Sequence, residues 1–122
     1  MPMPRRYLAL FRIADRHGIA LSVAAMMAIT IASLMPRGGV GDPGEADKIA
    51  HVLAYGAATL PAAVGRTAPA IWVAAAVIGW SGLIELVQPL IGRSGSLSDL
   101  VANAGGVAIG LVLAYFLRKA SA

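Results

Sequence analysis

The stretch ELVQPLIGRSGSLSDLVANAGGVAIG, residues 85–110, joins the end of one apolar run to the start of another through a short polar loop. Within it stand two acids, an arginine and two amides, Glu85, Gln88, Arg93, Asp99 and Asn103, together with three serines. Such groups are costly in apolar surroundings unless they find partners. The stretch therefore predicts that two apolar helices end beside each other and share a polar cluster, and the search for a function starts there.

The composition indicates an integral membrane protein of one domain. Hydrophobic residues make up 58% and charged residues 13% of the 122 residues, which is outside the range of ordinary soluble domains. The ten Lys and Arg residues lie between apolar runs instead of forming a patch with interleaved aromatic side chains, so we expect no nucleic-acid binding. The chain has no cysteine, which excludes disulfides, thiol nucleophiles and cysteine metal sites.

Four apolar runs, at residues 19–35, 49–65, 70–88 and 100–117, are expected to be membrane-spanning helices. At a rise of about 1.5 Å per residue each reaches roughly 26 to 29 Å, close to the thickness of about 30 Å of the hydrocarbon core. Pro61 is expected to kink the second run or to end it early. The predicted fold class is an all-α membrane protein, a four-transmembrane-helix bundle over residues 19–117.

The two ends of the chain are basic. In the segment 1–18, Arg5, Ala9, Arg12 and Arg16 recur at steps of four, three and four, so they share one face of a helix. This pattern is typical of a short interfacial helix on a membrane surface, and a solvated basic tail is an equally good interpretation. Residues 118–122 are expected to form a basic C-terminal tail.

The loop charges predict the orientation. If all four runs span, seven basic residues fall on one side of the membrane and three on the other. The richer side holds Arg5, Arg6, Arg12, Arg16, Arg66, Arg118 and Lys119, and the other holds Arg37, Lys48 and Arg93. Because basic loops stay in the cytoplasm, both termini are expected to be cytoplasmic. The polar residues of interest then lie at the extracytoplasmic face.

Polar residues recur at helical spacing near the outer ends of three runs. They are Lys48, His51 and Tyr55 at i, i+3 and i+7, Glu85 and Gln88 at i and i+3, and Asp99 and Asn103 at i and i+4. Three helices are expected to bring them into one pocket within about two turns of the surface. Ionisable residues at mid-membrane cost about 2.5 to 3.5 kcal/mol and are a functional-site hypothesis by default. A structural network of ion pairs near the headgroups is the alternative.

The residue types suggest roles in such a pocket. His51 is a candidate to move a proton, with Glu85 and Asp99 orienting it or acting as acid and base. The candidate ligand-binding residues are Lys48, Tyr55, Gln88, Arg93 and Asn103, of which Lys48 and Arg93 suit a phosphate. No nucleophile stands at a recognised spacing, so whether the chain is an enzyme stays open.

A metal or cofactor is not expected. His51, Glu85 and Asp99 are ligand types, yet the sequence has neither HExxH nor paired histidines.

A row of small residues follows the polar positions of the last run. Ala102, Gly106, Gly110 and Ala114 stand at every fourth position, and the two glycines make a GxxxG motif. Small residues let another helix approach closely. The row is expected to pack within the bundle, and a homodimer formed through it is the alternative.

The ordered motifs resemble the VanZ-like family over about residues 35–115. They are Asp47-Lys48-x-x-His51-x-x-x-Tyr55, Glu85-x-x-Gln88, Arg93 and Asp99-x-x-x-Asn103-x-x-Gly106-x-x-x-Gly110. Members of the family are small bacterial membrane proteins, named after a protein linked to teicoplanin resistance. The resemblance implies a multi-pass protein of the bacterial cytoplasmic (inner) membrane and a context in the cell envelope and glycopeptide tolerance. It assigns no catalytic roles.

The function expected from these observations is a polar site at the extracytoplasmic face that binds or acts on a cell-envelope lipid or lipid-linked headgroup. The expected partners are membrane lipids, including a lipid-linked envelope precursor. The alternative is a non-enzymatic structural or partner-binding membrane protein whose polar cluster only holds the fold together. Transport is less well supported, because the inner half of the runs has almost no polar residues.

Overall fold

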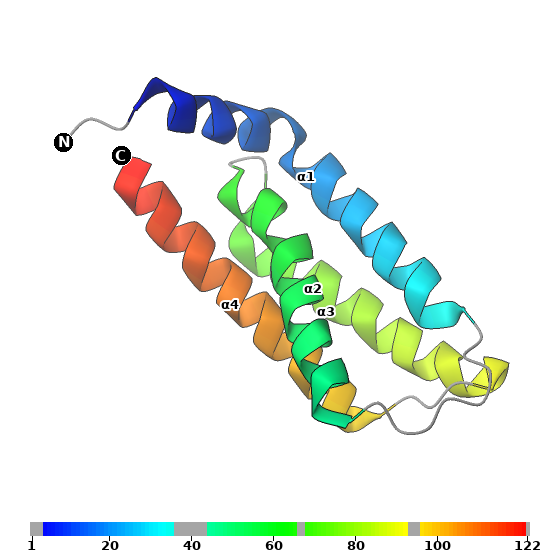
Figure 1. The fold of residues 1–122 in the computed structure, drawn as a ribbon. Helices are drawn as coiled ribbons and strands as arrows, with labels where there is room; N and C mark the ends of the chain where they lie inside the picture. Colours follow the sequence, from blue (N-terminus) through cyan, green and yellow to red (C-terminus); the bar gives the residue numbers. More distant parts are fainter. Residues whose placement is uncertain (1–3, 36–43, 66–67, 93–95, 122) are drawn as a thin grey trace.

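The computed structural model describes residues 4–35, 44–65, 68–92 and 96–121, and within them all regular structure is helical, as expected. The elements are α1 (Arg5–Leu34), α2 (Gly44–Val64), α3 (Ala70–Val87), the short 3-10 helix η1 (Gln88–Ile91) and α4 (Leu97–Ser121). Successive helices run in opposite directions along the bundle, and both termini lie at the same end (Figure 1). The predicted all-α fold is thus confirmed.

Three helical segments of the described chain are long and apolar enough to cross a membrane: Arg5–Leu34, Ala70–Ile91 and Leu97–Ala120. They contain the first, third and fourth expected runs, whereas α2, which holds the second, does not belong to this group. The reason is local. Asp47, Lys48 and His51 stand in the first turns of α2 and lower its mean hydropathy.

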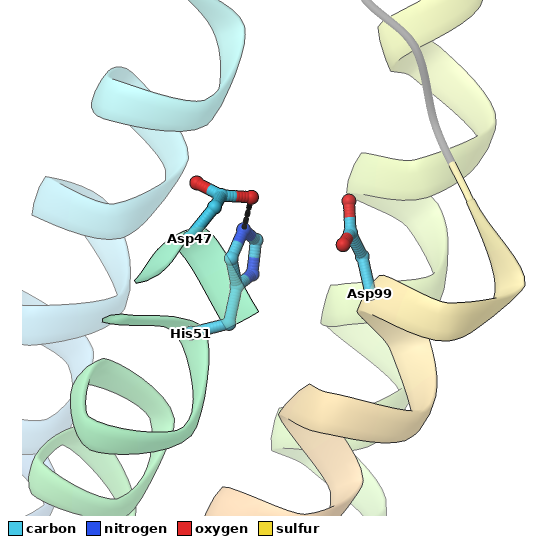
Figure 2. A group of neighbouring side chains, drawn as sticks. All are labelled: Asp47, His51 and Asp99. Carbon is cyan, nitrogen blue, oxygen red and sulfur yellow. Dashed lines mark ion pairs between the residues drawn. The ribbon is translucent and has the colours of Figure 1, made fainter. Parts of the chain in front are cut away.

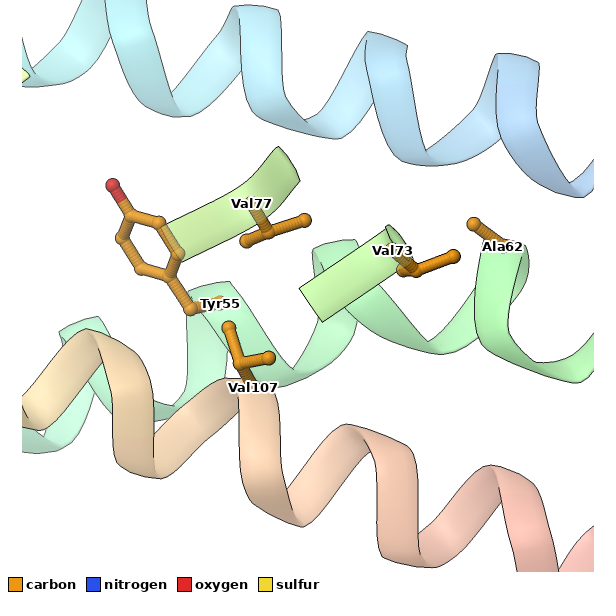
Figure 3. Close-up of a cluster of buried hydrophobic side chains, with 5 residues drawn as sticks. All are labelled: Tyr55, Ala62, Val73, Val77 and Val107. Atoms are coloured by element: carbon orange, nitrogen blue, oxygen red, sulfur yellow. The ribbon is translucent and has the colours of Figure 1, made fainter. Parts of the chain in front are cut away.

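α2 is nevertheless the best-covered helix of the bundle. It contacts α1, α3 and α4, the last most extensively. Tyr55, Ala58, Thr59 and Ala62 are each less than 5% exposed. The main hydrophobic cluster forms where α2 meets α3 and α4, and its buried members are Tyr55, Ala62, Val73, Val77 and Val107 (Figure 3).

Large apolar side chains cover the outside of the bundle, and small or polar ones fill much of its interior. Ile71 and Leu86 are both 72% exposed, for example. The buried polar residues are Ser22, Ser33, Thr59, Ser81, Gln88 and Asn103. A water-soluble bundle turns its polar face outward. The observed distribution instead suits lipid, where helices associate through close packing and interhelical hydrogen bonds.

The glycines of the last run lie against α2. A Cβ atom built on Gly106 would lie 2.4 Å from the carbonyl oxygen of Val52, and one on Gly110 would lie 2.9 Å from that of Gly56. Both distances are shorter than real Cβ contacts, so only glycine lets the two backbones approach this closely. A homodimer formed through these two glycines would have to displace α2.

α1 is a single helix of 30 residues where the sequence suggested a basic segment followed by a span. Figure 1 shows that it changes direction in its blue part, so that its first half lies over the ends of α2 and α4. Ala14 is buried there with Val64 and Ala114. Arg118 pairs with Asp15 and donates to the carbonyl oxygen of Val64. These contacts attach the first half of α1 to the bundle.

Pro61 lies inside α2 without ending it, contrary to one of the two expectations, since the helix continues to Val64. The neighbouring Ala62 N–H donates to Ser22 Oγ of α1 over 2.9 Å. The backbones of α1 and α2 lie close together here, since a Cβ atom built on Gly18 would lie 2.4 Å from the Pro61 carbonyl oxygen. Gly18, at the end of the basic segment, therefore lies within α1, at the contact of this helix with α2.

Candidate functional site

A set of polar side chains lies at the end of the bundle away from the termini, where the start of α2, the last turns of α3 and the start of α4 meet (Figure 1). Each member shares a hydrogen bond or ion pair with another member of the set. The members are Asp47, Lys48, His51, Ser81, Glu85, Ser96, Ser98, Asp99 and Asn103. We call this set the polar layer.

Asn103 is the centre of the polar layer. Its Oδ1 lies 2.8 Å from His51 Nδ1, and its Nδ2 donates to Ser81 Oγ over 2.7 Å. Asn103 is 1% exposed and Ser81 is fully buried. One amide from α4 therefore joins α2 to α3 in the interior, where each bond satisfies a group that would otherwise be costly to bury.

His51 also faces two carboxylates. Its Nε2 lies 3.3 Å from Asp47 Oδ2, one turn earlier on α2. Asp99 faces the pair from the first turn of α4 (Figure 2). Each of the three offers a potential metal-ligand atom, and these atoms all lie within 4.8 Å of one another. The structure thus groups Asp47, instead of the expected Glu85, with His51 and Asp99.

Lys48 is a cationic member of the polar layer. Its Nζ donates to Ser98 Oγ over 2.7 Å and lies 3.7 Å from Asp99 Oδ1. The Lys48 side chain is 48% exposed, against 16% for Asp99. The ammonium group therefore lies on the exposed side of the polar layer, where an anionic ligand can reach it.

Glu85 connects α3 to the start of α4. Its Oε2 accepts the Ser96 N–H over 2.8 Å, and Ser96 Oγ accepts the Asp99 N–H over 3.1 Å. Ser96 is thus the N-cap residue of α4, and the pattern Ser96-x-x-Asp99 is a capping-box type of spacing that the sequence already carried. Glu85 is close enough to Asp99, His51 and Asp47 to interact with their charges.

Tyr55, Gln88 and Arg93 were also expected to bind a ligand. Tyr55 is 2% exposed, packs in the main hydrophobic cluster and shares a side-chain hydrogen bond with Ser81 of the polar layer. Gln88 is buried and donates from Nε2 to the carbonyl oxygen of Ser33 in α1, over 3.1 Å. Arg93 lies outside the described residues. The candidates that the structure brings together are Lys48, His51, Glu85, Asp99 and Asn103.

Four members of the polar layer, Asp47, Ser81, Ser96 and Ser98, were not among the residues predicted for the site. The structure pairs Asp47 with His51, one turn further on. Ser81 lies within an apolar run. The spacing of Ser81, Glu85 and Gln88, at i, i+4 and i+7, was the signal that Ser81 shares a face with the polar positions of that helix.

A hollow of about 540 Å³ opens between α3 and α4 beside Glu85. Its wall is apolar except for Glu85 and Ser96, and its lining residues are Gly79, Gly82, Leu83, Glu85, Leu86, Ser96, Leu97 and Leu100. Cβ atoms built on Gly79 and Gly82 would meet nothing within 4 Å, so these two glycines leave the space open. The hollow connects the polar layer with the apolar outside of the bundle.

A larger groove of about 660 Å³ lies between α1 and α3 and is almost wholly apolar. The polar groups on its wall are already bonded within the protein. Trp80 Nε1 donates to Thr30 Oγ1 over 2.8 Å, and Ser22 Oγ accepts a backbone N–H of α2. This groove suits hydrocarbon chains but offers nothing to select a headgroup.

A protein-family model described as VanZ/LLP1 matches residues 6–118, which confirms the resemblance seen in the sequence. No curated protein and no solved structure matches the chain. The family match and the three span-like helices together support a VanZ-like membrane protein.

Proposed function

This chain belongs to the VanZ family, and we propose that its polar layer binds the headgroup of a cell-envelope lipid or lipid-linked precursor at the extracytoplasmic face. The polar layer then acts at the point where a lipid headgroup meets its acyl chains. Tolerance of teicoplanin is the phenotype we propose for such a protein, in keeping with the context of its family.

The observation that carries this proposal is the hollow beside Glu85. Its volume of about 540 Å³ lies within the usual range of small-molecule sites, roughly 300 to 1,000 Å³. Leu83, Leu86 and Leu100 offer an apolar wall to a chain, and Glu85 offers a charged group at the boundary with the polar layer. A lipid has this division between an apolar and a polar part, and it reaches the hollow laterally from the bilayer.

The chemistry of the polar layer suits a headgroup with both anionic and hydroxyl groups. Lys48, on the exposed side of the layer, can bind a phosphate. The carboxylates of Glu85 and Asp99 accept hydrogen bonds from hydroxyl or ammonium groups. His51 is held by Asn103 at one ring nitrogen and faces the carboxylate of Asp47 with the other. Binding needs only these contacts, and catalysis would require a reacting atom beside His51.

The proposed topology has four spans with both termini in the cytoplasm of the bacterial inner membrane. α2 has 21 residues, about 31 Å of helix, and its polar turns lie at one end, where the headgroups begin. α1, at about 45 Å, exceeds the hydrocarbon core, so its first half reaches the cytoplasmic interface with Arg5, Arg12 and Arg16 exposed.

Single introduced cysteines test this topology, because the chain has none of its own. Ser121→Cys is expected to be shielded from a membrane-impermeant thiol reagent in intact cells, and Gly41→Cys is expected to react. Permeabilised cells provide the control, since both variants should then react. Labelling of Ser121→Cys without permeabilisation would reverse the orientation and remove the polar layer from the outer face.

Gly82→Leu tests the hollow itself. The new side chain has room, since a Cβ atom there meets nothing within 4 Å, and it fills space that we assign to an acyl chain. Co-purified lipid, measured by mass spectrometry, should fall at least severalfold with little change in thermal stability. Gly105→Leu is the matched control, because its Cβ is equally unobstructed and Gly105 does not line the hollow. Equal lipid content in the two variants would contradict the proposal.

The second candidate function is a structural or partner-binding role in which the polar layer only fastens the helices. The observation in its favour is that Asn103 and Ser96 make bonds that build the fold, one between buried helices and the other at the start of α4. The variant Asp99→Glu distinguishes the structural role from the ligand-binding role. A loose network tolerates the longer carboxylate, whereas a site that holds a ligand tightly loses function with the protein still folded.

A further inference from the structure

We propose that Asp47, His51 and Asp99 bind a divalent metal ion, with Zn²⁺ as the matching species. The three side chains come from the first turns of α2 and α4 and face one another (Figure 2). Their nearest potential ligand atoms all lie within 4.8 Å of one another, and each residue is partly buried. One imidazole nitrogen and two carboxylate oxygens form a ligand set that Zn²⁺ accepts.

The distance between the first two ligands already fits a bound ion. Zn²⁺ bonds of about 2.0 to 2.2 Å in a tetrahedral arrangement separate neighbouring ligand atoms by roughly 3.3 to 3.5 Å. His51 Nε2 and Asp47 Oδ2 are 3.3 Å apart. Asp99 stands on the facing helix, with a carboxylate oxygen within 4.8 Å of the other two ligand atoms.

A second observation concerns which nitrogen of His51 is available. Asn103 Oδ1 is an acceptor, so its 2.8 Å contact with Nδ1 requires the proton of a neutral ring to be on Nδ1. The lone pair of that ring is then on Nε2, which faces the Asp47 carboxylate. A metal ion between Nε2 and this carboxylate can take a lone pair from each. Metal-binding histidines are held in the same way, by a carbonyl that fixes the other ring nitrogen.

The carboxylates around His51 favour a divalent cation there. Among the described residues of the polar layer, Asp47, Glu85 and Asp99 bring three carboxylates close enough for their charges to interact. A divalent ion bound by Asp47 and Asp99 lowers the repulsion between these carboxylates. Three protein ligands also leave a fourth position open, to which a headgroup phosphate can bind; this last step rests on the proposed function.

Metal binding is tested on the full-length chain without a polyhistidine tag, purified in detergent and stripped with a chelator. Calorimetric titration with Zn²⁺ is expected to show one ion bound per chain, and Co²⁺ to give the visible absorption of a four-coordinate site. His51→Gln, Asp47→Asn and Asp99→Asn should each weaken Zn²⁺ binding by more than the roughly 10- to 100-fold lost with an outer-shell partner. His17→Gln is the control, because His17 is exposed on α1 and is the only other histidine.

Folded wild-type protein that binds no stoichiometric Zn²⁺ would overturn the metal site, as would unchanged affinity in His51→Gln or Asp99→Asn. The wild-type titration decides the matter even if a variant fails to fold. No lipid is added in the Zn²⁺ titration, so a failure to bind Zn²⁺ does not affect the lipid measurement on Gly82→Leu. If the lipid measurement contradicts the proposed function instead, the Zn²⁺ result still holds.

Discussion

Gly106→Leu is expected to abolish accumulation of the folded protein in the membrane. Its Cβ atom would lie 2.4 Å from Val52 O and 3.1 Å from Gly56 N, both backbone atoms of α2, so that no rotamer relieves the contact. α2 and α4 form the largest helix interface of the bundle and would have to separate. Overpacking commonly costs about 1 to 3 kcal/mol, and a clash with backbone belongs at or above the top of that range.

Gly105→Leu is the matched control for this variant, since the neighbouring Cβ meets nothing within 4 Å. Gly92 is a poorer comparison, because its φ of 76° strains any other residue whatever the space around it. Accumulation and thermal stability in detergent are the measurements. Wild-type stability of Gly106→Leu would mean that α4 does not pack on α2 through its glycines.

Removing charge from the polar layer is expected to abolish the envelope phenotype and leave the fold in place. Glu85→Gln retains a side-chain oxygen that can accept the Ser96 N–H. Asp99→Asn leaves the helix cap untouched, because the cap bond uses the backbone N–H of residue 99. Both variants should accumulate normally, and teicoplanin tolerance of the host should fall to the level of a strain without the protein.

Asn103→Leu is the contrasting variant, with a structural effect expected. The substitution removes the bonds that Asn103 makes to His51 Nδ1 and Ser81 Oγ, at a cost of about 1 to 3 kcal/mol for each group left unsatisfied. Abundance and phenotype should therefore fall together. If the whole layer is structural, Glu85→Gln and Asp99→Asn will behave in the same way.

The double variant Glu85→Gln with Asp99→Asn adds a test of whether the two residues act as one unit. Residues that serve a single function give losses that are far from additive, so the double variant should be hardly worse than either single one. Normal accumulation together with a retained phenotype in both single variants would refute a working site, and the chain would then be a small helical membrane scaffold.

Local sequence was enough to predict the helices and the family. The apolar runs at 70–88 and 100–117 lie within the segments that the structure identifies as span-like, because length and hydropathy are properties of a single helix. The boundary expected near residue 18 does not interrupt α1. A change from basic to apolar residues alters what a helix faces without breaking its hydrogen bonds, and Gly18 serves a contact with Pro61.

The sequence by itself also determined which polar residues share a helix face. The pairs at helical spacing are Lys48 and His51, Glu85 and Gln88, and Asp99 and Asn103. Only the tertiary structure decided which helix each face meets. It turned Gln88 towards α1, buried Tyr55 in the core and made Asn103 the link between His51 and Ser81. The physical reason is that periodicity fixes a direction around one helix axis. Partners depend on how closely the axes approach, and here backbone contacts at Gly106 and Gly110 set that distance.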